Sequence, residues 1–123
     1  MLKVSGAFHS ELMADAKEKL KTVLETMDIK EPVIDFISNI DAEITKDPAK
    51  IKENLANQLD NKTLWEASVN KAASMGITDF VEVGPGSVLK GLLKKINPAL
   101  NVTSIHTPED IDTLLVNNKT VSN

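Results

Sequence analysis

The chain has 123 residues, of which 41% are hydrophobic and 26% charged, and its formal net charge is −4. This length and composition are typical of one globular domain with a core of its own. Because there is no basic excess to neutralise phosphates, nucleic acid is disfavoured as a partner. The absence of cysteine excludes disulfides, thiolate metal sites and a cysteine nucleophile.

No apolar run reaches the roughly 20 residues that a membrane helix needs, and the first residues lack the apolar centre of a signal peptide. We therefore expect a cytoplasmic protein with no membrane partner. All 14 basic residues are lysine. A rigid bidentate clamp on a carboxylate normally uses arginine, so this chain alone cannot supply one.

The first half of the chain predicts one strand among three helices. Apolar residues spaced three and four apart predict a helix over 10–28, which Ser10 can cap. Residues 33–38 follow Pro32 and predict a strand. Asp47 and Pro48 are typical of a helix start, and a third helix is expected to end at Gly76.

The second half predicts strands at 79–83 and 101–105, with a helix after each. This alternation indicates an α/β fold: a small parallel sheet of about three strands flanked by helices. The edges of so small a sheet would be exposed unless another chain or segment paired with them. We place the body of the domain at 1–116 and expect a polar, frayed tail over 117–123.

His9 is the first residue that could carry chemistry, because an imidazole is a general base near neutral pH. A lone histidine in a loop is nevertheless more often structural than catalytic. Ser10 is adjacent in sequence, which does not place its hydroxyl on the imidazole, so it is expected to be a helix cap. Neither His9 nor His106 has a second ligand nearby in sequence, which disfavours a metal site.

Three further features each have a structural and a functional reading. The turn Gly84-Pro85-Gly86 is either a tight turn needing positive φ or, less strongly indicated, an anion-binding or nucleotide loop. Gln58 lies near a helix end, where a backbone carbonyl could hold a histidine tautomer, although a surface role is the simpler one. Trp65, the only tryptophan, is expected in the core.

Four segments together resemble the acyltransferase family that loads malonyl groups onto acyl carrier proteins. Their order and spacing agree with the family, and the resemblance extends over nearly the whole chain. The segments are 4–13 (VSGAFHSELM), 37–39 (ISN), 57–59 (NQL) followed by Trp65, and 82–92 (EVGPGSVLKGL).

The resemblance implies an α/β-hydrolase-like body and a two-step transfer. In this family a serine attacks the malonyl thioester, and a histidine takes its proton and later activates the phosphopantetheine thiol of the carrier. That histidine matches His9. The backbone carbonyl that holds its second ring nitrogen matches Gln58. Phe8 matches the position whose phenylalanine accompanies malonyl selectivity, by filling the space of a methyl branch.

The chain also departs from the family pattern. It lacks the Gly-His-Ser-x-Gly elbow, the carboxylate-binding arginine, the oxyanion-hole segment and the ferredoxin-like insert. It corresponds to roughly the last two-fifths of a relative of ordinary single-domain size. We expect the isolated chain to be inactive.

Two functions follow from these matches and departures. In the first, the chain is part of an S-malonyltransferase of fatty acid biosynthesis. Its substrates are then malonyl-CoA and phosphopantetheinylated acyl carrier protein, and no cofactor is needed. Its partners are acyl carrier protein and either the missing N-terminal part or a second copy of the chain. In the alternative, it is a non-catalytic remnant or a partner-binding module.

Overall fold

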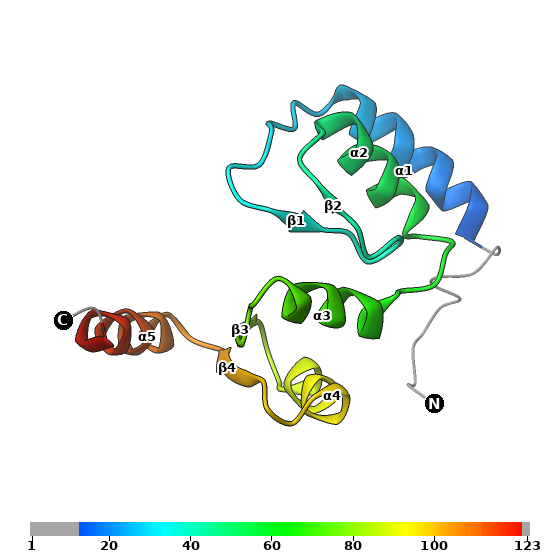
Figure 1. Cartoon of the computed structure of the whole chain (residues 1–123). Helices are drawn as coiled ribbons and strands as arrows, with labels where there is room; N and C mark the ends of the chain where they lie inside the picture. Colours follow the sequence, from blue (N-terminus) through cyan, green and yellow to red (C-terminus); the bar gives the residue numbers. More distant parts are fainter. Residues whose placement is uncertain (1–12, 122–123) are drawn as a thin grey trace. The chain divides into compact units, whose positions relative to one another are not determined.

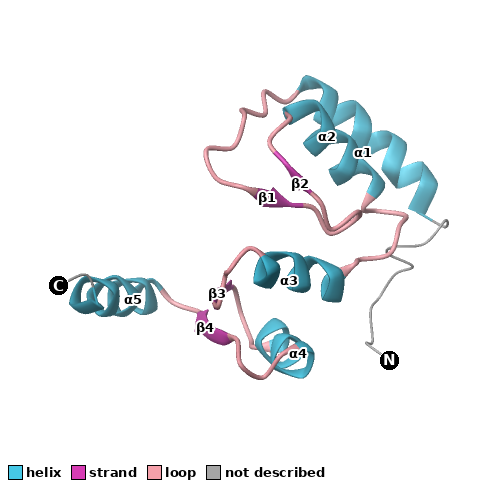
Figure 2. Cartoon of the chain, viewed as in Figure 1, coloured by secondary structure: helices cyan, strands magenta, loops and turns pink. Residues whose placement is uncertain are grey.

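The computed structural model describes residues 13–121, so Phe8, His9 and Ser10 lie outside the described residues. The chain forms two compact units, Met1–Ala72 and Ala73–Asn123. Figures 1 and 2 show the order of the helices and strands along the chain.

Unit 1 is built from two packed helices, α1 (Ala14–Thr26) and α2 (Pro48–Asn57), a short hairpin and α3 (Trp65–Ser74). Helix α1 packs against α2, and Leu24 and Ile51 are buried. The predicted start of α2 is confirmed, because the carboxylate of Asp47 accepts a 2.9 Å hydrogen bond from the N–H of Ala49. Asp47 thus satisfies one of the amides that a helix leaves without a helical partner.

The expected strand at 33–38 is mostly wrong. Only β1 (Phe36–Ile37) is a strand, and it pairs antiparallel with β2 (Ile44–Thr45) instead of joining a parallel sheet. Val33 and Ile34 form a bend and are highly exposed. A run of β-branched residues indicates an extended backbone but does not identify its pairing partner.

Unit 2 contains β3 (Asp79–Val83), α4 (Val88–Ile96), β4 (Asn101–Ile105) and α5 (Pro108–Val121). Strands β3 and β4 pair in parallel, from Asp79 opposite Asn101 to Val83 opposite Ile105. Both strands have the bounds expected from the sequence. Helix α5 continues to Val121, so the polar residues from 117 to 120 belong to a helix.

The predicted fold class is confirmed as helices around a small parallel sheet, but this sheet has two strands rather than about three. The helix α4 between the two strands makes the crossover that a parallel pair requires. Within 13–121, no helix is long and apolar enough to cross a membrane.

Candidate functional site

Gln58 lies at the end of α2, where its own hydrogen bonds fix the last turn. Its backbone N–H donates to the carbonyl of Asn54 over 2.9 Å. Its side-chain Nε2 donates to the carbonyl of Asn61 at 3.4 Å and to Oγ1 of Thr63 at 3.3 Å. The side chain therefore ties the helix end to the link that follows, and the backbone of Gln58 is held in place.

The link between α2 and α3 is also held by residues of α1 and of the β1–β2 loop. The ammonium of Lys17 on α1 binds the carboxylate of Asp60 at 3.0 Å, and both side chains are partly buried. The hydrogen bond from Lys17 lowers the pKa of Asp60, and this effect outweighs the opposing effect of burial. At the other end of the link, the N–H of Leu64 donates to the carbonyl of Asn39 over 2.7 Å.

The loop over 38–43, between β1 and β2, is bonded to α2. The N–H of Ala42 donates to the carbonyl of Ser38 over 2.9 Å, and Nδ2 of the buried Asn54 donates to the carboxylate of Asp41 over 3.1 Å. Ala42 adopts a φ of 56°, in the left-handed region that favours glycine. Such a conformation persists only where surrounding bonds hold it, so this loop is firmly fixed on α2.

Between this loop and α2 lies a hollow of about 220 Å³. It brings together two of the segments that carried the family resemblance, because Ser38 and Asn39 line it together with Gln58. The remaining lining residues are Phe36, Ile37, Asn54 and Leu55. His9 and Phe8 lie outside the described residues, so the contact between His9 and the carbonyl of Gln58 stays a prediction.

The turn over 84–86 in unit 2 has the structural role expected from its glycines. Gly84 has a φ of 136° and Gly86 a φ of 85°, both in the region that side chains disfavour. A Cβ at either position would meet no atom within 4 Å. The glycines therefore serve backbone conformation rather than close approach of another group.

The N-terminus of α4, just after this turn, already holds a carboxylate. Glu82 of β3 accepts from the N–H of Leu89 at 2.9 Å, from the N–H of Lys90 at 3.1 Å and from Oγ of Ser104 at 3.2 Å. Burial raises the pKa of Glu82, but the two backbone bonds and the Ser104 bond lower it more, so the net shift is downward. The amides that a phosphate would use are taken, which argues against a nucleotide loop.

His106 is held by the same turn. Its Nδ1 lies 2.7 Å from the carbonyl oxygen of Gly84. Because a carbonyl can only accept, Nδ1 carries the hydrogen of this bond. The next helix starts with a capping box: Asp110 accepts from the N–H groups of His106 and Thr107, and Oγ1 of Thr107 accepts from the N–H of Asp110.

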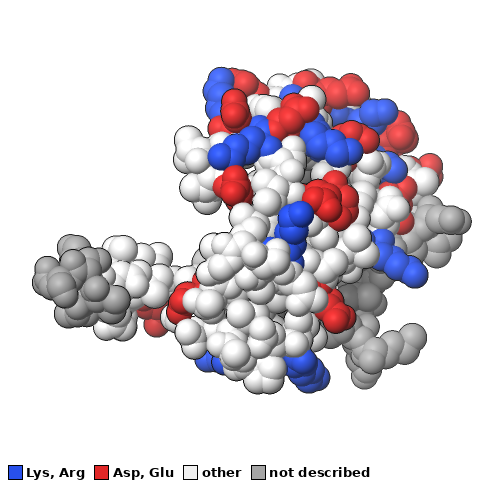
Figure 3. All heavy atoms as spheres, viewed as in Figure 1, with Lys and Arg blue, Asp and Glu red and all other residues white. Residues whose placement is uncertain are grey.

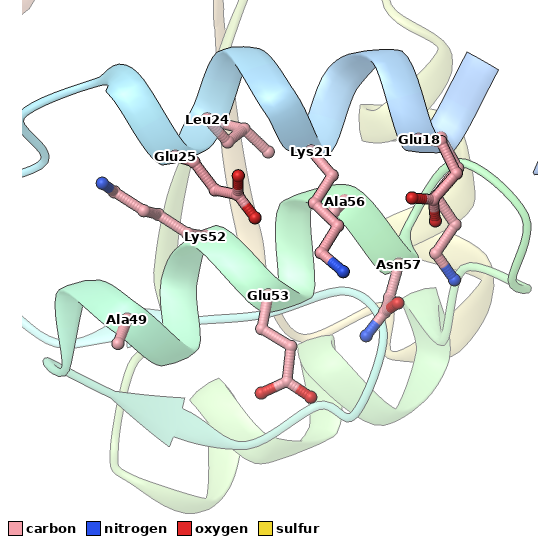
Figure 4. Close-up of a pocket in the computed structure, with 10 residues that line it drawn as sticks. Glu18, Lys21, Leu24, Glu25, Ala49, Lys52, Glu53, Ala56 and Asn57 are labelled. Atoms are coloured by element: carbon pink, nitrogen blue, oxygen red, sulfur yellow. The ribbon is translucent and has the colours of Figure 1, made fainter. Parts of the chain in front are cut away.

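A larger groove of about 520 Å³ lies between α1 and α2 (Figure 4). Its apolar floor includes Leu24 and Ala56, and Lys21 and Glu25 of α1 point toward α2. The charged lining consists of three lysines and three glutamates: Lys17, Lys21, Lys52, Glu18, Glu25 and Glu53. This balance favours neither an anion nor a cation. Among residues 13–121 no group of three or more His, Asp or Glu side chains could hold a metal ion.

Sequence reasoning missed Asn54 and Glu82, which fix the two regions just described. Asn54 is an asparagine inside a helix, buried at 4% exposure, and a polar residue at a core-facing helical position was the available signal. Glu82 stands two residues before the Gly84 turn. The strand alternation could have placed its side chain on the face that α4 covers, but not on the amides of α4.

Comparison with known proteins gives a consistent result. No protein-family model matches the chain. A malonyl CoA-acyl carrier protein transacylase of Bacillus subtilis is 48% identical over 111 residues, which is 90% of this chain and 35% of that protein. An acyl-carrier-protein S-malonyltransferase structure from Burkholderia pseudomallei is 39% identical with a TM-score of 0.84, over 93% of this chain and 37% of the other.

A third match is a malonyl-transacylase solved in complex with its type II PKS acyl-carrier protein. It is 33% identical with a TM-score of 0.86, over 94% of this chain and 38% of the other. The resemblance drawn from the four segments is therefore confirmed, and so is the fold. The chain spans little more than a third of the length of these relatives.

Proposed function

We propose that this chain, homologous over nine tenths of its length to part of the malonyl CoA-acyl carrier protein transacylases, supplies the histidine base of an S-malonyltransferase of fatty acid biosynthesis. His9 is the base, and the serine nucleophile belongs to a polypeptide segment outside this chain. One observation carries the proposal. The residue that matches the histidine-orienting position, Gln58, lies at a helix end that its own bonds to Asn54, Asn61 and Thr63 and the Lys17–Asp60 ion pair keep in place.

The proposed reaction has two halves. The serine oxygen attacks the malonyl thioester carbon while His9 accepts the serine proton, and coenzyme A leaves with that proton on its sulfur. The carrier's phosphopantetheine thiol then gives its proton to His9 and attacks the malonyl-serine ester, and the proton returns to the serine oxygen. At the start of each half His9 must present one nitrogen as acceptor, which a carbonyl bound to the N–H of its other nitrogen favours.

Gln58 acts in this scheme through its backbone. Its side chain holds the link rather than the imidazole, so the orienting group would be its carbonyl. We propose Phe8 as the residue that excludes a branched acyl group, and acyl carrier protein as the partner that brings the thiol. Discrimination of one methyl group in this way is worth about 1–3 kcal/mol.

Restoration of activity by a complementary polypeptide tests the proposal. The probe is the portion of the Bacillus subtilis relative that this chain does not match, produced separately and mixed with the full chain. Malonyl transfer from malonyl-CoA to a carrier protein is then measured. We expect transfer from the mixture and none from either polypeptide alone.

The two histidines of the chain provide a matched control. His9→Gln should lower the rate of the mixture by roughly a thousandfold or more, since it removes the base. His106→Gln should leave the rate within a few fold, because His106 contacts the Gly84 turn and no proposed reacting group. Equal losses in both variants would contradict the assignment of the base.

The second candidate is a partner-binding module without catalysis. It is favoured by the absence from this sequence of the serine elbow and of every arginine. A mixture that associates tightly but transfers no malonyl group would decide for this module.

A further inference from the structure

One ion pair of unit 1 joins the start of α1 to the residues that follow α2. Nζ of Lys17 lies 3.0 Å from Oδ2 and 3.2 Å from Oδ1 of Asp60. The two side chains are 22% and 18% exposed, which is less than in any other ion pair among residues 13–121. Because water and side-chain entropy oppose an exposed pair, this enclosed pair is the one best able to hold two elements together.

Asp60 extends this restraint to the last turn of α2. Its Oδ1 accepts a 2.8 Å hydrogen bond from Nδ2 of Asn61, and the same Nδ2 donates to the carbonyl of Asn57 over 2.9 Å. Asn57 immediately precedes Gln58. Since a planar peptide group leaves only two soft dihedrals per residue, a carbonyl held at Asn57 restricts the direction of the next one, that of Gln58.

The other end of the pair lies close in sequence to the predicted base. Lys17 stands in the first turn of α1, eight residues after His9. In Figure 4 the start of α1, marked by Glu18, and the end of α2, marked by Asn57, lie at the same end of the groove. The pair therefore fastens the helix that follows His9 to the helix end that carries Gln58.

We infer that Lys17 and Asp60 are a positioning pair for the transfer reaction. Their bond sets the start of α1 against the end of α2, and thereby keeps the imidazole of His9 on the carbonyl of Gln58. Neither side chain takes part in proton transfer in this scheme. The inference rests on the proposed function for the roles of His9 and Gln58. A pair that only stabilised unit 1 would leave the imidazole unchanged in every variant that folds.

The tautomer of His9 distinguishes these two roles. A ring nitrogen bonded to a carbonyl keeps its hydrogen, so one neutral tautomer predominates and the two nitrogen-15 signals of the ring stay far apart. The full chain, labelled with nitrogen-15 at histidine, is measured at about pH 8.5, where histidine is ordinarily neutral. His106 is the internal reference, because the carbonyl of Gly84 binds its Nδ1.

Lys17→Met should reduce the excess of one His9 tautomer about fivefold or more, because the partner carboxylate is left unpaired and the link moves. The signals of His106 should stay unchanged. Lys17→Arg should keep the single tautomer, since a guanidinium also pairs with a carboxylate. Lys50→Met is the matched control: it removes an exposed pair with Glu53 on α2 and should leave both histidines as they are.

A second variant covers the case in which the unpaired carboxylate unfolds unit 1. Lys17→Met combined with Asp60→Asn leaves no unpaired charge, and the fluorescence of Trp65 verifies that unit 1 is folded. The same loss of the single tautomer is expected. The inference is overturned if His9 keeps one tautomer in either folded variant, or if Lys17→Arg or Lys50→Met loses it as fully as Lys17→Met does.

Catalysis by the mixture with the unmatched portion of the Bacillus subtilis relative gives a second readout. Lys17→Met should lower kcat about tenfold and leave KM for malonyl-CoA within about threefold, because the base is displaced while the substrate contacts remain. A raised KM with an unchanged kcat would overturn the positioning role.

The two measurements separate this inference from the proposed function. A mixture that transfers no malonyl group even with the unaltered chain contradicts the proposed function, while the tautomer comparison still decides for or against the pair. A His9 ring without a preferred tautomer in the unaltered chain overturns the inference, and the transfer assay then decides on the proposed function separately.

Discussion

Each of the two units of this chain has its own kind of buried interior. In unit 1 the buried residues include three polar ones, Ser38, Asn54 and Ser68, and polar bonds connect elements far apart in sequence. Among the described residues of unit 2 the buried set is apolar: Leu93, Leu100 and Ile105. Charged side chains of both signs gather over α1 and α2 of unit 1 in Figure 3.

Hydrogen-bonded buried polar groups such as Asn54 fix one geometry of the segments that they join. An apolar core depends instead on the packing and volume of its side chains. The comparison is sharpened by changes that should affect one unit and spare the other.

The largest effect is expected from the core of unit 2. Leu93 is 3% exposed, and Leu93→Ala should destabilise unit 2 by about 2–5 kcal/mol, because it removes buried methyl groups and leaves a cavity. Hydrogen exchange of the β4 amides measures this loss. Under conditions in which the β4 amides of Leu93→Ala have lost protection, the fluorescence of Trp65, the single tryptophan, should still be that of folded unit 1.

The neighbouring residue is the control for this change. Leu92 is 37% exposed, so Leu92→Ala should cost about 1 kcal/mol or less. If the Trp65 fluorescence and the protection of the β4 amides changed together in Leu93→Ala, the two units would unfold as one. Their stabilities could then not be compared separately.

A smaller effect is expected in unit 1. Asn54→Ala removes the 3.1 Å bond to Asp41 and should cost about 1–3 kcal/mol, because the loop over 38–43 loses its anchor on α2. Denaturant unfolding followed by Trp65 fluorescence measures it. Lys50→Ala, which breaks an exposed pair with Glu53 on the same helix, should change stability by about 0.5 kcal/mol or less.

Acid should affect unit 2 more than unit 1. Three of its carboxyl groups have a lowered pKa: Asp79, by bonds from Thr78 and Asn101, and Glu82 and Asp110, by bonds from backbone amides. In unit 1 only Asp60 among the described residues shows such a shift. Each of these groups binds its proton less readily in the folded state than in the unfolded state.

The direction of the pH dependence follows. Their stabilisation is complete above the ordinary pKa values of 3.8 for aspartate and 4.5 for glutamate, and it is lost as the pH falls through the lowered folded values. The protection of the β4 amides, measured relative to intrinsic exchange at the same pH, should therefore fall at a higher pH than that at which Trp65 fluorescence changes. Glu82→Gln should make unit 2 less stable at neutral pH and less sensitive to acid. An acid transition of unit 2 that Glu82→Gln leaves unaltered would contradict this role.

The sequence predicted unit 2 better than unit 1, for a physical reason. The strand and helix bounds of unit 2 follow from local signals: apolar alternation, the Gly84 turn and Pro108 at a helix start. In unit 1 the hairpin depends on the left-handed conformation of Ala42 and on the hydrogen bond from Asn54 to Asp41. The spacing of apolar residues along the sequence predicts neither of these features. The family segments singled out Gln58 as a predicted site residue, while the hydrogen bonds that hold its helix end required the structure.

Glu82 gives the Gly84 turn a further property. A strand followed by a glycine turn and a helix is the architecture that many proteins use to receive phosphate, and here a carboxylate of the same chain accepts from two amides of the helix N-terminus. An incoming anion would have to displace this tethered group to reach those two amides. The turn thus joins β3, α4 and the ring of His106 through bonds within the chain itself.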